Sequence, residues 1–331
     1  MAVTLLGALL LSATPTAQAP VPGAGQVSPA PLVDAEIRSV AAGRVVLRRR
    51  TGTVVGDGRT VYVANGTAFR PAPRRVALPP RVRARSWVVA DLDTGRLLGK
   101  HRARATLPQA STMKLLTAVT ATRTVPSRTR HRITRFEASQ VCACAGVRLN
   151  RYYTRDTLLT GMLLPSGNDA AEAVAGSHPR GRRAFYRAMN RIAQRLGAVD
   201  TVAKNASGLT AEGSHSSARD LVILLRAAVA DESVAEILGK RSAELATVNG
   251  ALSHTVWRGT DYVNKYADSL GKSGWTTPAK NTLVVVTEIK GHRIAVAQLG
   301  APTGYPTSNA RALTTWAAEN VDDLRPVGRL P

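Results

Sequence analysis

The sequence predicts an α+β fold in which strands from the two ends of the chain form one antiparallel sheet around a helical middle. Apolar, β-branched runs occur at 87–91 and 96–99, and again at 282–287 and 293–299. The stretch between them spaces its apolar residues as helices do. Strands at both ends bury their apolar faces most simply in a shared sheet, so we expect one main domain.

The residues before this domain predict a signal peptide, a linker and a small hairpin. An apolar run at 3–13 is followed by the small-residue pattern Thr16-Ala17-Gln18-Ala19, which is typical of secretory cleavage sites, although no basic residue precedes Arg38. Short β-like runs at 45–47 and 60–63 flank Gly56-Asp57-Gly58, a turn signal. We therefore expect export to the cell wall, the extracellular space or the outer face of the cytoplasmic membrane. The predicted division is 1–19 signal peptide, either cleaved or kept as an anchor, 20–80 linker and β-hairpin extension, 81–322 main domain and 323–331 tail.

The first strands of the main domain, 87–91 and 96–99, are joined around Asp93-Thr94-Gly95, a hairpin turn signal. After Pro108 the pattern becomes helical. Ser217-Ala218-Arg219-Asp220 predicts a capping box at the start of one helix. Besides the helix that begins near Ser111, helices are expected at 155–164, 169–175, 181–196, 218–230 and 308–320.

The formal net charge is +23, and nearly all of the basic residues are arginine. One interpretation is attraction to a polyanion such as anionic wall polymers or a lipid surface, and the other is a general preference for arginine on a solvated surface. Aromatic residues make up only 4% of the chain, and no zinc-finger spacing or RNA-binding aromatic pattern occurs. We therefore expect no nucleic-acid partner.

The two cysteines, Cys142 and Cys144, are separated by a single alanine. In an exported protein an even count favours a disulfide, although two residues so close in sequence strain its usual geometry. A small disulfide or two free thiols are both compatible with the pattern. A metal site would need further ligands, and no histidine lies nearby in the sequence, so neither a metal nor a cofactor is expected.

The strongest chemical signal is Ser111-Thr112-Met113-Lys114 at the predicted helix start. A serine hydroxyl needs a base to become a nucleophile, and a neutral lysine one helical turn later supplies one. Burial and a second cation both lower a lysine pKa, and Lys272 is the candidate for that cation. A serine cap before a solvated lysine is the ordinary alternative. A second match, Ser269-Leu270-Gly271-Lys272, lies in a β-like context and is interpreted as a coincidence.

Two further motifs follow in order. Ser166-Gly167-Asn168 comes after an apolar helix that stops at Pro165, where a hydroxyl could relay a proton and an amide could hold a peptide. Lys272-Ser273-Gly274 precedes Trp275-Thr276 near a predicted strand, where a cation and a hydroxyl could bind a carboxylate and the glycine allows close backbone approach. Each motif alone fits an ordinary loop or strand, but the three together, in this order and context, predict a serine acyl-transfer site.

In these motifs the chain resembles the serine D-Ala-D-Ala carboxypeptidases among the low-molecular-weight penicillin-binding proteins. The resemblance extends to the sequence around the second motif, 158–171, and to the blocks 205–209 and 216–221, and it covers about 82–320. It implies a penicillin-binding protein/β-lactamase-like fold, with a helical subdomain beside the sheet. The implied substrate is the D-Ala-D-Ala end of peptidoglycan pentapeptides, and β-lactam antibiotics are implied as covalent inhibitors.

The resemblance also implies residue roles. Ser111 would be the nucleophile and Lys114 the general base, Ser166 would relay a proton to the leaving D-alanine, and Asn168 would hold the substrate amide. Lys272 and Ser273 would bind the terminal carboxylate, and the backbone N–H groups of Ser111 and Trp275 would form the oxyanion hole. The substrate-binding stretch is Lys272, Ser273, Gly274, Trp275 and Thr276. Ser273 stands where the family usually has threonine, which is expected to shift turnover or β-lactam preference.

Three alternatives stay open at this level. A class A-like β-lactamase would need a deacylating glutamate in a Glu-x-x-Leu-Asn stretch, and none occurs between Ser166 and Lys272. A DD-endopeptidase acting on cross-links would use the same site. A non-catalytic wall-binding module of the same fold would retain the architecture without hydrolysis. Carboxypeptidase activity is the favoured interpretation because all the proposed catalytic side chains are present.

Overall fold

The computed structural model describes residues 36–40, 44–48, 53–55, 61–65, 67–71, 75–77 and 79–331. The predicted signal peptide at 1–19 and linker at 20–33 lie outside the described residues. Every helix among the described residues is too short or too polar to traverse a bilayer.

The described strands form one large sheet and three two-stranded ribbons. The large sheet runs in the order β1-β2-β4-β5-β8-β7-β15-β14-β13, with β16 on β5 and β17 on β8. Its strands are β1 (Glu36–Val40), β2 (Arg44–Arg48), β4 (Val61–Ala64), β5 (Thr67–Pro71), β7 (Ser86–Asp91), β8 (Arg96–His101), β13 (Ser269–Thr276), β14 (Lys280–Ile289), β15 (His292–Ala301), β16 (Leu324–Arg325) and β17 (Gly328–Arg329). The ribbons pair β3 (Thr53–Val55) with β6 (Arg75–Ala77), β9 (Arg130–Arg132) with β10 (Tyr152–Thr154), and β11 (Ser242–Ala246) with β12 (Ser253–Trp257).

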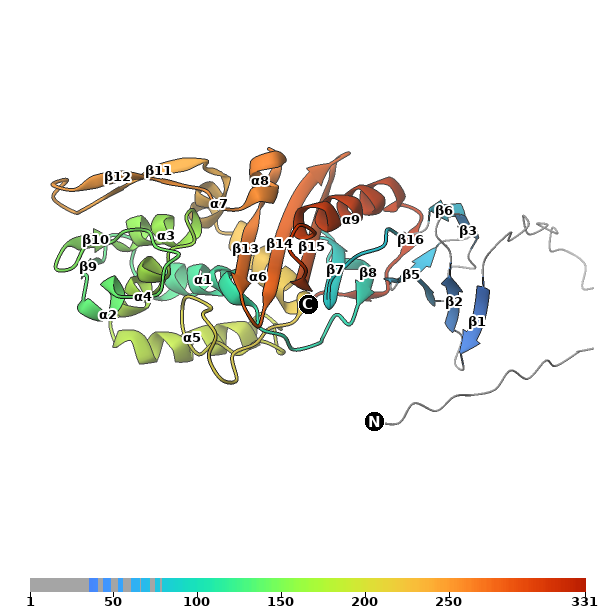
Figure 1. Cartoon of the computed structure of the whole chain (residues 1–331), viewed down its shortest axis with the longest axis horizontal. Helices are drawn as coiled ribbons and strands as arrows, with labels where there is room; N and C mark the ends of the chain where they lie inside the picture. The colour runs from blue at the N-terminus through green and yellow to red at the C-terminus, as the bar shows by residue number, and fades with distance from the viewer. Residues whose placement is uncertain are drawn as a thin grey trace, which may run out of the picture. The chain divides into compact units, whose positions relative to one another are not determined.

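The sheet confirms the predicted α+β fold, because β7 pairs antiparallel with both β8 and β15. Strand alternation then divides the core into two layers. Val88 in β7 and Val284 in β14 join the cluster under the helical region, whereas Val89 and Val285 join the cluster on the opposite face. Figure 1 shows α9 (Pro306–Asn320) lying along β14 and β15. Both faces of the central strands are therefore covered, which explains why these strands are nearly continuous apolar runs.

The helices form mostly where the sequence predicts them, within one or two residues. The described helices are the 3₁₀ helix η1 (Ala110–Met113), α1 (Lys114–Thr124), α2 (Arg135–Ala138), α3 (Arg155–Leu163), α4 (Asn168–Gly176), α5 (Gly181–Arg195), α6 (Ala218–Val229), α7 (Glu232–Gly239), α8 (Asp261–Lys265) and α9. The expected hydroxyl cap of α6 is confirmed, because Ser217 Oγ accepts from the Asp220 N–H at 3.1 Å. The reciprocal half of the expected capping box is wrong, since the Asp220 carboxylate instead accepts from Asp200 N and Thr201 Oγ1.

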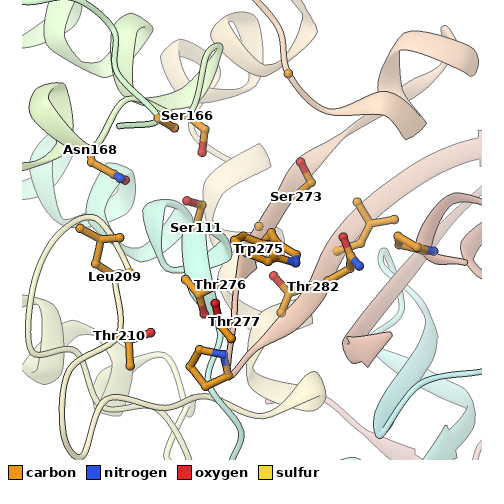
Figure 2. A pocket seen from close by; sticks show the side chains of 18 of the residues that line it. Ser111, Ser166, Asn168, Leu209, Thr210, Ser273, Trp275, Thr276, Thr277 and Thr282 are labelled. Atoms are coloured by element: carbon orange, nitrogen blue, oxygen red, sulfur yellow. The ribbon is translucent and has the colours of Figure 1, made fainter. Parts of the chain in front are cut away.

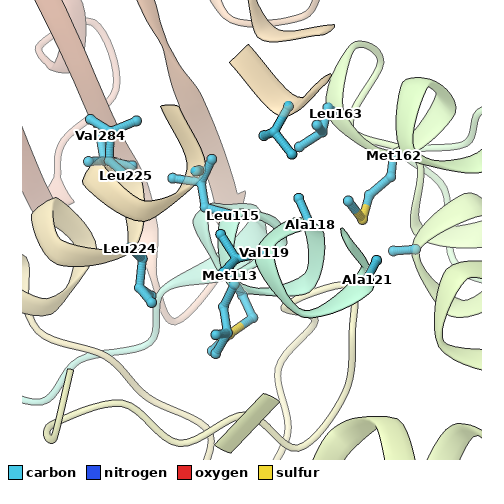
Figure 3. Packing of buried hydrophobic residues seen from close by; sticks show 14 of the residues in the cluster. Met113, Leu115, Ala118, Val119, Ala121, Met162, Leu163, Leu224, Leu225 and Val284 are labelled. Carbon is cyan, nitrogen blue, oxygen red and sulfur yellow. The ribbon is translucent and has the colours of Figure 1, made fainter. Parts of the chain in front are cut away.

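Helix α1 lies at the centre of the helical region. Residues 114–121 are all buried, so the helix is enclosed on every side rather than on one stripe. In Figure 3 its side chains Leu115 and Val119 lie among residues from α3, α6 and β14, including Met162, Leu225 and Val284. A lysine at the first position of such a helix is removed from water by its neighbours.

The segments on either side of the main domain differ from expectation in one respect. The runs 45–47 and 60–63 were expected to form a hairpin, but β2 and β4 pair in parallel, so this prediction is wrong. The chain between them is long enough for a parallel crossover and includes β3, which pairs with β6. Strand β5 is hydrogen-bonded to β8 and β16, so strands from before residue 80 and after residue 322 belong to the same sheet. The division of the chain into domains at these residues stays a prediction.

Candidate active site

A cavity of about 740 Å³ opens between the helical region and the edge strand β13, and it brings the three motifs together. Its lining includes Ser111, Ser166, Asn168, Ser273 and Trp275. Figure 2 shows their side chains arranged around one space, with Ser111 and Ser166 on the helical side and Ser273 and Trp275 on the strand side. Residues up to 164 positions apart in the sequence thus meet at one cavity.

Ser111 lies in η1, directly before α1, as the sequence predicts for a helix start. Lys114 follows one turn later and is fully buried. Its Nζ lies 2.8 Å from Ser111 Oγ, 2.8 Å from Asn168 Oδ1 and 2.7 Å from Ser207 O. A neutral amine would donate to the two carbonyl oxygens and accept from the serine hydroxyl, which is the arrangement that a general base needs.

The electrostatics favour this neutral form. Burial lowers the pKa of Lys114 well below its ordinary value, and the positive charge of Lys272 lowers it further. The carboxylates of Glu172 and Asp169 act in the opposite direction. Desolvation is the largest cause, so the lowered pKa follows mainly from the enclosure of α1.

Gly274 and Gly208 allow the backbone to close tightly around Ser111. A Cβ at Gly274 would lie 2.6 Å from Ser111 N and 3.0 Å from Ala110 Cβ. A Cβ at Gly208, where φ is +80°, would lie 2.0 Å from Ala110 O. Both positions require glycine, and Gly274 lets β13 pass directly beside the Ser111 amide.

The third motif lies on β13, the last strand of the sheet, whose outer edge pairs with no other strand of the described part of the chain. Lys272 is 1% exposed, and its Nζ donates to Ser273 O at 2.9 Å. Burial lowers the pKa of Lys272 to about 7. Ser273 Oγ lies 3.3 Å from Thr260 Oγ1, and Trp275 and Thr276 line the cavity. The Trp275 side chain is 60% exposed.

The second motif begins with Ser166, which has φ of +66° and lies in the loop before α4. A non-glycine residue in this left-handed region is uncommon and marks a constrained backbone of the kind found at functional sites. Asn168 starts α4, and its Nδ2 donates to Val141 O at 2.6 Å. The second N–H of that amide has no acceptor among the described residues, so it is available to a bound carbonyl.

The other S-x-x-K match does not form a site. Ser269 is 2% exposed in β13, and its Oγ lies 2.9 Å from Thr287 Oγ1. Residues three apart in a strand point to opposite faces, so Ser269 and Lys272 are not neighbours as they would be in a helix. The interpretation of this match as a coincidence is supported.

The sequence analysis did not identify Glu172 and the residues around it, which fix the hydrogen-bond partner Ser207 O of Lys114. Glu172 is 1% exposed and accepts from Ala206 N at 3.0 Å and Ser207 N at 3.2 Å, which fixes the Ser207 carbonyl on Lys114. Arg182 and Tyr186 also contact the Glu172 carboxylate. The spacing of Glu172 four residues after Asn168 on one helix face was the signal that could have identified it.

Comparisons with known proteins agree on one family. The family model described as D-alanyl-D-alanine carboxypeptidase matches residues 74–303. The chain is 34% identical over 243 residues to a D-alanyl-D-alanine carboxypeptidase of Mycobacterium tuberculosis, covering 70% of this chain and 81% of that protein. It is 29% identical over 256 residues to a D-alanyl-D-alanine endopeptidase of Escherichia coli, covering 75% and 81%. The crystal structure of a D-alanyl-D-alanine carboxypeptidase from M. tuberculosis matches with a TM-score of 0.72 and 32% identity, over 78% of this chain and 99% of that one.

Proposed function

The chain belongs to the D-alanyl-D-alanine carboxypeptidase family of serine peptidases, and on this premise we propose how its residues carry out the reaction. The protein is a serine D-Ala-D-Ala carboxypeptidase that removes the terminal D-alanine from peptidoglycan pentapeptide stems through an acyl-enzyme. It acts in the cell envelope and is acylated by β-lactams. The observation that carries the mechanism is the 2.8 Å contact between Ser111 Oγ and the fully buried Lys114 Nζ.

Acylation begins with Ser111. Its Oγ attacks the carbonyl carbon of the penultimate D-alanine while neutral Lys114 takes the hydroxyl proton. The oxyanion that forms accepts hydrogen bonds from the backbone N–H groups of Ser111 and Trp275. The passage of β13 beside the Ser111 amide, which Gly274 permits, supports this pairing of donors. Fixed donors of this kind are typically worth about 3 kcal/mol each in the transition state.

Collapse of the intermediate breaks the peptide bond. The departing D-alanine nitrogen takes a proton that Lys114 passes through Ser166, and Ser111 remains as an ester of the shortened stem peptide. Water then attacks that ester with Lys114 again acting as base, which releases the product and restores the Ser111 hydroxyl. The position of Ser111 and Ser166 on the same side of the cavity supports the relay.

The substrate is held by the edge strand and by Asn168. An extended peptide can add to the free edge of β13 through main-chain hydrogen bonds. The terminal carboxylate would then bind the Lys272 ammonium and the Ser273 hydroxyl, with Thr276 further along the same strand. The unpaired N–H of the Asn168 side chain would bind a backbone carbonyl of the stem.

The surroundings of Glu172 disfavour a β-lactamase. Glu172 is a buried carboxylate close to the site, and such a group could in principle activate a deacylating water. Its oxygens, however, already accept from two backbone N–H groups and from Tyr186, and they contact Arg182. Three of the about four acceptor sites of this carboxylate are therefore occupied, and the positive charge of Arg182 beside it makes it a poor base for a water. We therefore expect the penicilloyl ester to persist.

Endopeptidase activity on cross-links would use the same catalytic groups, and two relatives carry that name. A non-catalytic wall-binding role is disfavoured because the Ser111–Lys114 contact is already made. The test of the main activity is release of free D-alanine from a D-Ala-D-Ala pentapeptide. Release of D-alanine from the pentapeptide without cleavage of a cross-linked dimer into its two stems supports a carboxypeptidase. Penicillin binding without any release would support the binding role.

Ser111 is tested with a matched control that the chain supplies. Ser111→Ala should abolish covalent labelling by fluorescent penicillin, with the acylation rate falling by at least about a thousandfold, because Ser111 is the hydroxyl that contacts Lys114 among the described residues. Ser269→Ala removes the serine of the other S-x-x-K match and should leave labelling unchanged. Labelling that survives in Ser111→Ala and is lost in Ser269→Ala would contradict the assignment.

We further propose that the protein is exported and that an arginine-rich face binds anionic wall polymers. A second cavity, of about 380 Å³, is lined by the exposed Arg130 and Arg151, with Arg132 and Arg148 exposed nearby. Such a cluster attracts phosphate or carboxylate groups. Binding of purified wall polymer should weaken with added salt and with Arg130→Gln/Arg151→Gln, but not with Arg325→Gln in β16. Equal binding by all three proteins would contradict it, and preference for anionic vesicles would indicate a lipid surface instead.

A further inference from the structure

A short loop with a disulfide forms one wall of the active-site cavity. Cys142 and Cys144 are joined by a disulfide, which decides between the two states that the sequence left open. Val141, Cys142 and Ala143 line the cavity beside Asn168. The loop therefore touches the site without supplying any of the groups assigned to the reaction.

The backbone of this loop holds Asn168 at two points. Asn168 Nδ2 donates to Val141 O at 2.6 Å, and Asn168 N donates to Ala143 O at 2.7 Å. The Ala143 carbonyl lies within the ring that the disulfide closes, and the Val141 carbonyl is bonded directly to Cys142 N at the start of that ring. The other end of the same amide, Oδ1, accepts from Lys114 Nζ at 2.8 Å. One continuous path thus runs from the disulfide loop through Asn168 and Lys114 to Ser111.

The loop is anchored on both sides of the disulfide: before it Gln140 Nε2 donates to Phe136 O in α2 at 2.9 Å, and after it the anchor is Asp169. The Asp169 carboxylate accepts from three consecutive N–H groups, those of Ala145, Gly146 and Val147, at 2.7–3.1 Å. By contrast, Val141 is 69% exposed and Cys142 and Ala143 are also exposed. Their side chains bury too little apolar surface to fix the segment, since ordering a residue costs about 1–2 kcal/mol. The cross-link is the covalent restraint on this exposed part of the loop.

We propose that the Cys142–Cys144 disulfide is a positioning element for acylation, and that its reduction slows acylation of Ser111 by loosening the hold on Asn168. The proposal rests on the proposed function, because it concerns the same nucleophile and base. Cys142 and Cys144 are positioning residues: they act through Asn168 on the orientation of Lys114. A dithiol breaks the S–S bond, is itself oxidised to a cyclic disulfide, and leaves two thiols on the loop.

The chain suits a direct test because Cys142 and Cys144 are its only cysteines, so a reductant acts on this bond alone. The full chain is reduced with dithiothreitol, freed of reductant under argon, and mixed with fluorescent penicillin over a range of concentrations. The limiting acylation rate should fall on the order of tenfold, since misplacing a catalytic group by less than 1 Å has effects of this size. The dissociation constant of the pre-covalent complex should change less than twofold, and re-oxidation should restore the rate.

Two variants separate positioning from general loosening. Cys142→Ser/Cys144→Ser should acylate at the rate of the reduced protein and should not respond to dithiothreitol. In Asn168→Ala, which acylates more slowly in both states, reduction should cause less than a twofold further loss, because the path through Asn168 is already cut. End-point labelling stoichiometry, measured in each protein, shows that the same fraction is folded and competent.

Equal acylation rates for the oxidised and reduced proteins would overturn the proposal. So would a tenfold loss on reduction of Asn168→Ala, which would mean that the loop acts by another route. Failure of the proposed function looks different, because the oxidised protein would then release no D-alanine from the pentapeptide, whatever the effect of reduction on its labelling. The positioning role is supported if reduction slows acylation, leaves end-point labelling unchanged, and has less than a twofold effect on the acylation rate of Asn168→Ala.

Discussion

Lys114 and Lys272 are two lysines buried to the same degree, at 0% and 1% exposure, in two different regions of the molecule. Lys114 lies on the central helix with three oxygen atoms around its Nζ. Lys272 lies on the edge strand and, among the described residues, donates only to Ser273 O. Burial lowers the pKa of both, so burial alone does not separate their roles.

The difference lies in what surrounds each amine. Lys114 is held by fixed partners and lies next to another cation, so a neutral amine directed at Ser111 is favoured. Lys272 keeps N–H groups that no described acceptor uses, and its neighbour Ser273 lines the cavity, which suits an incoming carboxylate. Two equally buried lysines thus have different roles. Lys114, whose amine has a full set of hydrogen-bond partners, acts as a base, and Lys272, whose amine has unused N–H groups, binds an anion.

The largest effect should come from removing the base. Lys114→Met preserves the approximate volume of the side chain but cannot accept a proton, and general-base catalysis is typically worth about 10²–10⁴-fold. We expect the rate of penicillin acylation to fall by about a thousandfold. The control is Lys240→Met, a partly exposed lysine paired with Glu236, which should acylate normally. If Lys114→Met retains a tenth of the acylation rate, Lys114 is not the general base and does not differ from Lys272 in that role.

The next largest effect concerns the contact between the two regions. Gly274→Ala places a Cβ 2.6 Å from Ser111 N, so β13 must move away from the nucleophile and the oxyanion hole must widen. We expect kcat for D-alanine release to fall by about a hundredfold, as for loss of one oxyanion donor. Gly239→Ala is the matched control, because its Cβ would meet only Leu270 at 3.6 Å. Equal activity of the two variants would show that the close approach is not needed.

The pH dependence should report Lys272. Its pKa of about 7 means that the ammonium form is present below pH 7 and is lost as pH rises through that value. If the ammonium binds the substrate carboxylate, kcat/KM for the pentapeptide should fall by about tenfold per pH unit above about pH 7, because this ratio reports the free enzyme. Lys272→Arg, whose charge does not titrate in this range, should remove that decline. A decline that persists in Lys272→Arg would assign it to another group.

The smallest effect is expected at Ser273. Ser273→Thr introduces the residue that is usual in the family and keeps the hydroxyl near Thr260 Oγ1. We expect the ratio of peptide turnover to penicillin acylation to change by about two- to fivefold. Ser273→Ala removes the hydroxyl and is the reference variant. We expect it to raise KM for the pentapeptide more than Ser273→Thr does. Identical ratios in the serine and threonine proteins would mean that this substitution is neutral.

Much of the fold could be predicted from local patterns. The strands that hold Val88 and Val89, and Val284 and Val285, were visible in the sequence as apolar runs, and strand geometry then sends neighbouring residues to two different cores. The short elements were not: α2, α7, α8 and the ribbons β9–β10 and β11–β12 carry too few residues for a clear period. The prediction of a hairpin at 45–63 was wrong because the apolar runs do not determine which strands pair. Strand β2 pairs antiparallel with β1 and parallel with β4.

The candidate site divides in the same way. Ser111, Lys114, Ser166, Asn168, Lys272 and Ser273 were identified from motif order, and the structure brings all six residues to one region around the cavity. Glu172, the Ser207 carbonyl and the disulfide loop were not identified as parts of it. Their contributions are contacts between segments 27–93 residues apart, which no local pattern records.

The sequence by itself determined the chemistry that is available: a serine and a lysine one helical turn apart, a loop with a hydroxyl and an amide, and a lysine and a glycine on a strand. Tertiary structure alone decided the state of those groups. Enclosure of α1 lowers the pKa of Lys114, the end position of β13 leaves an edge open, and the Cys142–Cys144 loop fixes Asn168. The physical reason is that desolvation and hydrogen-bond partners depend on which distant segments pack together.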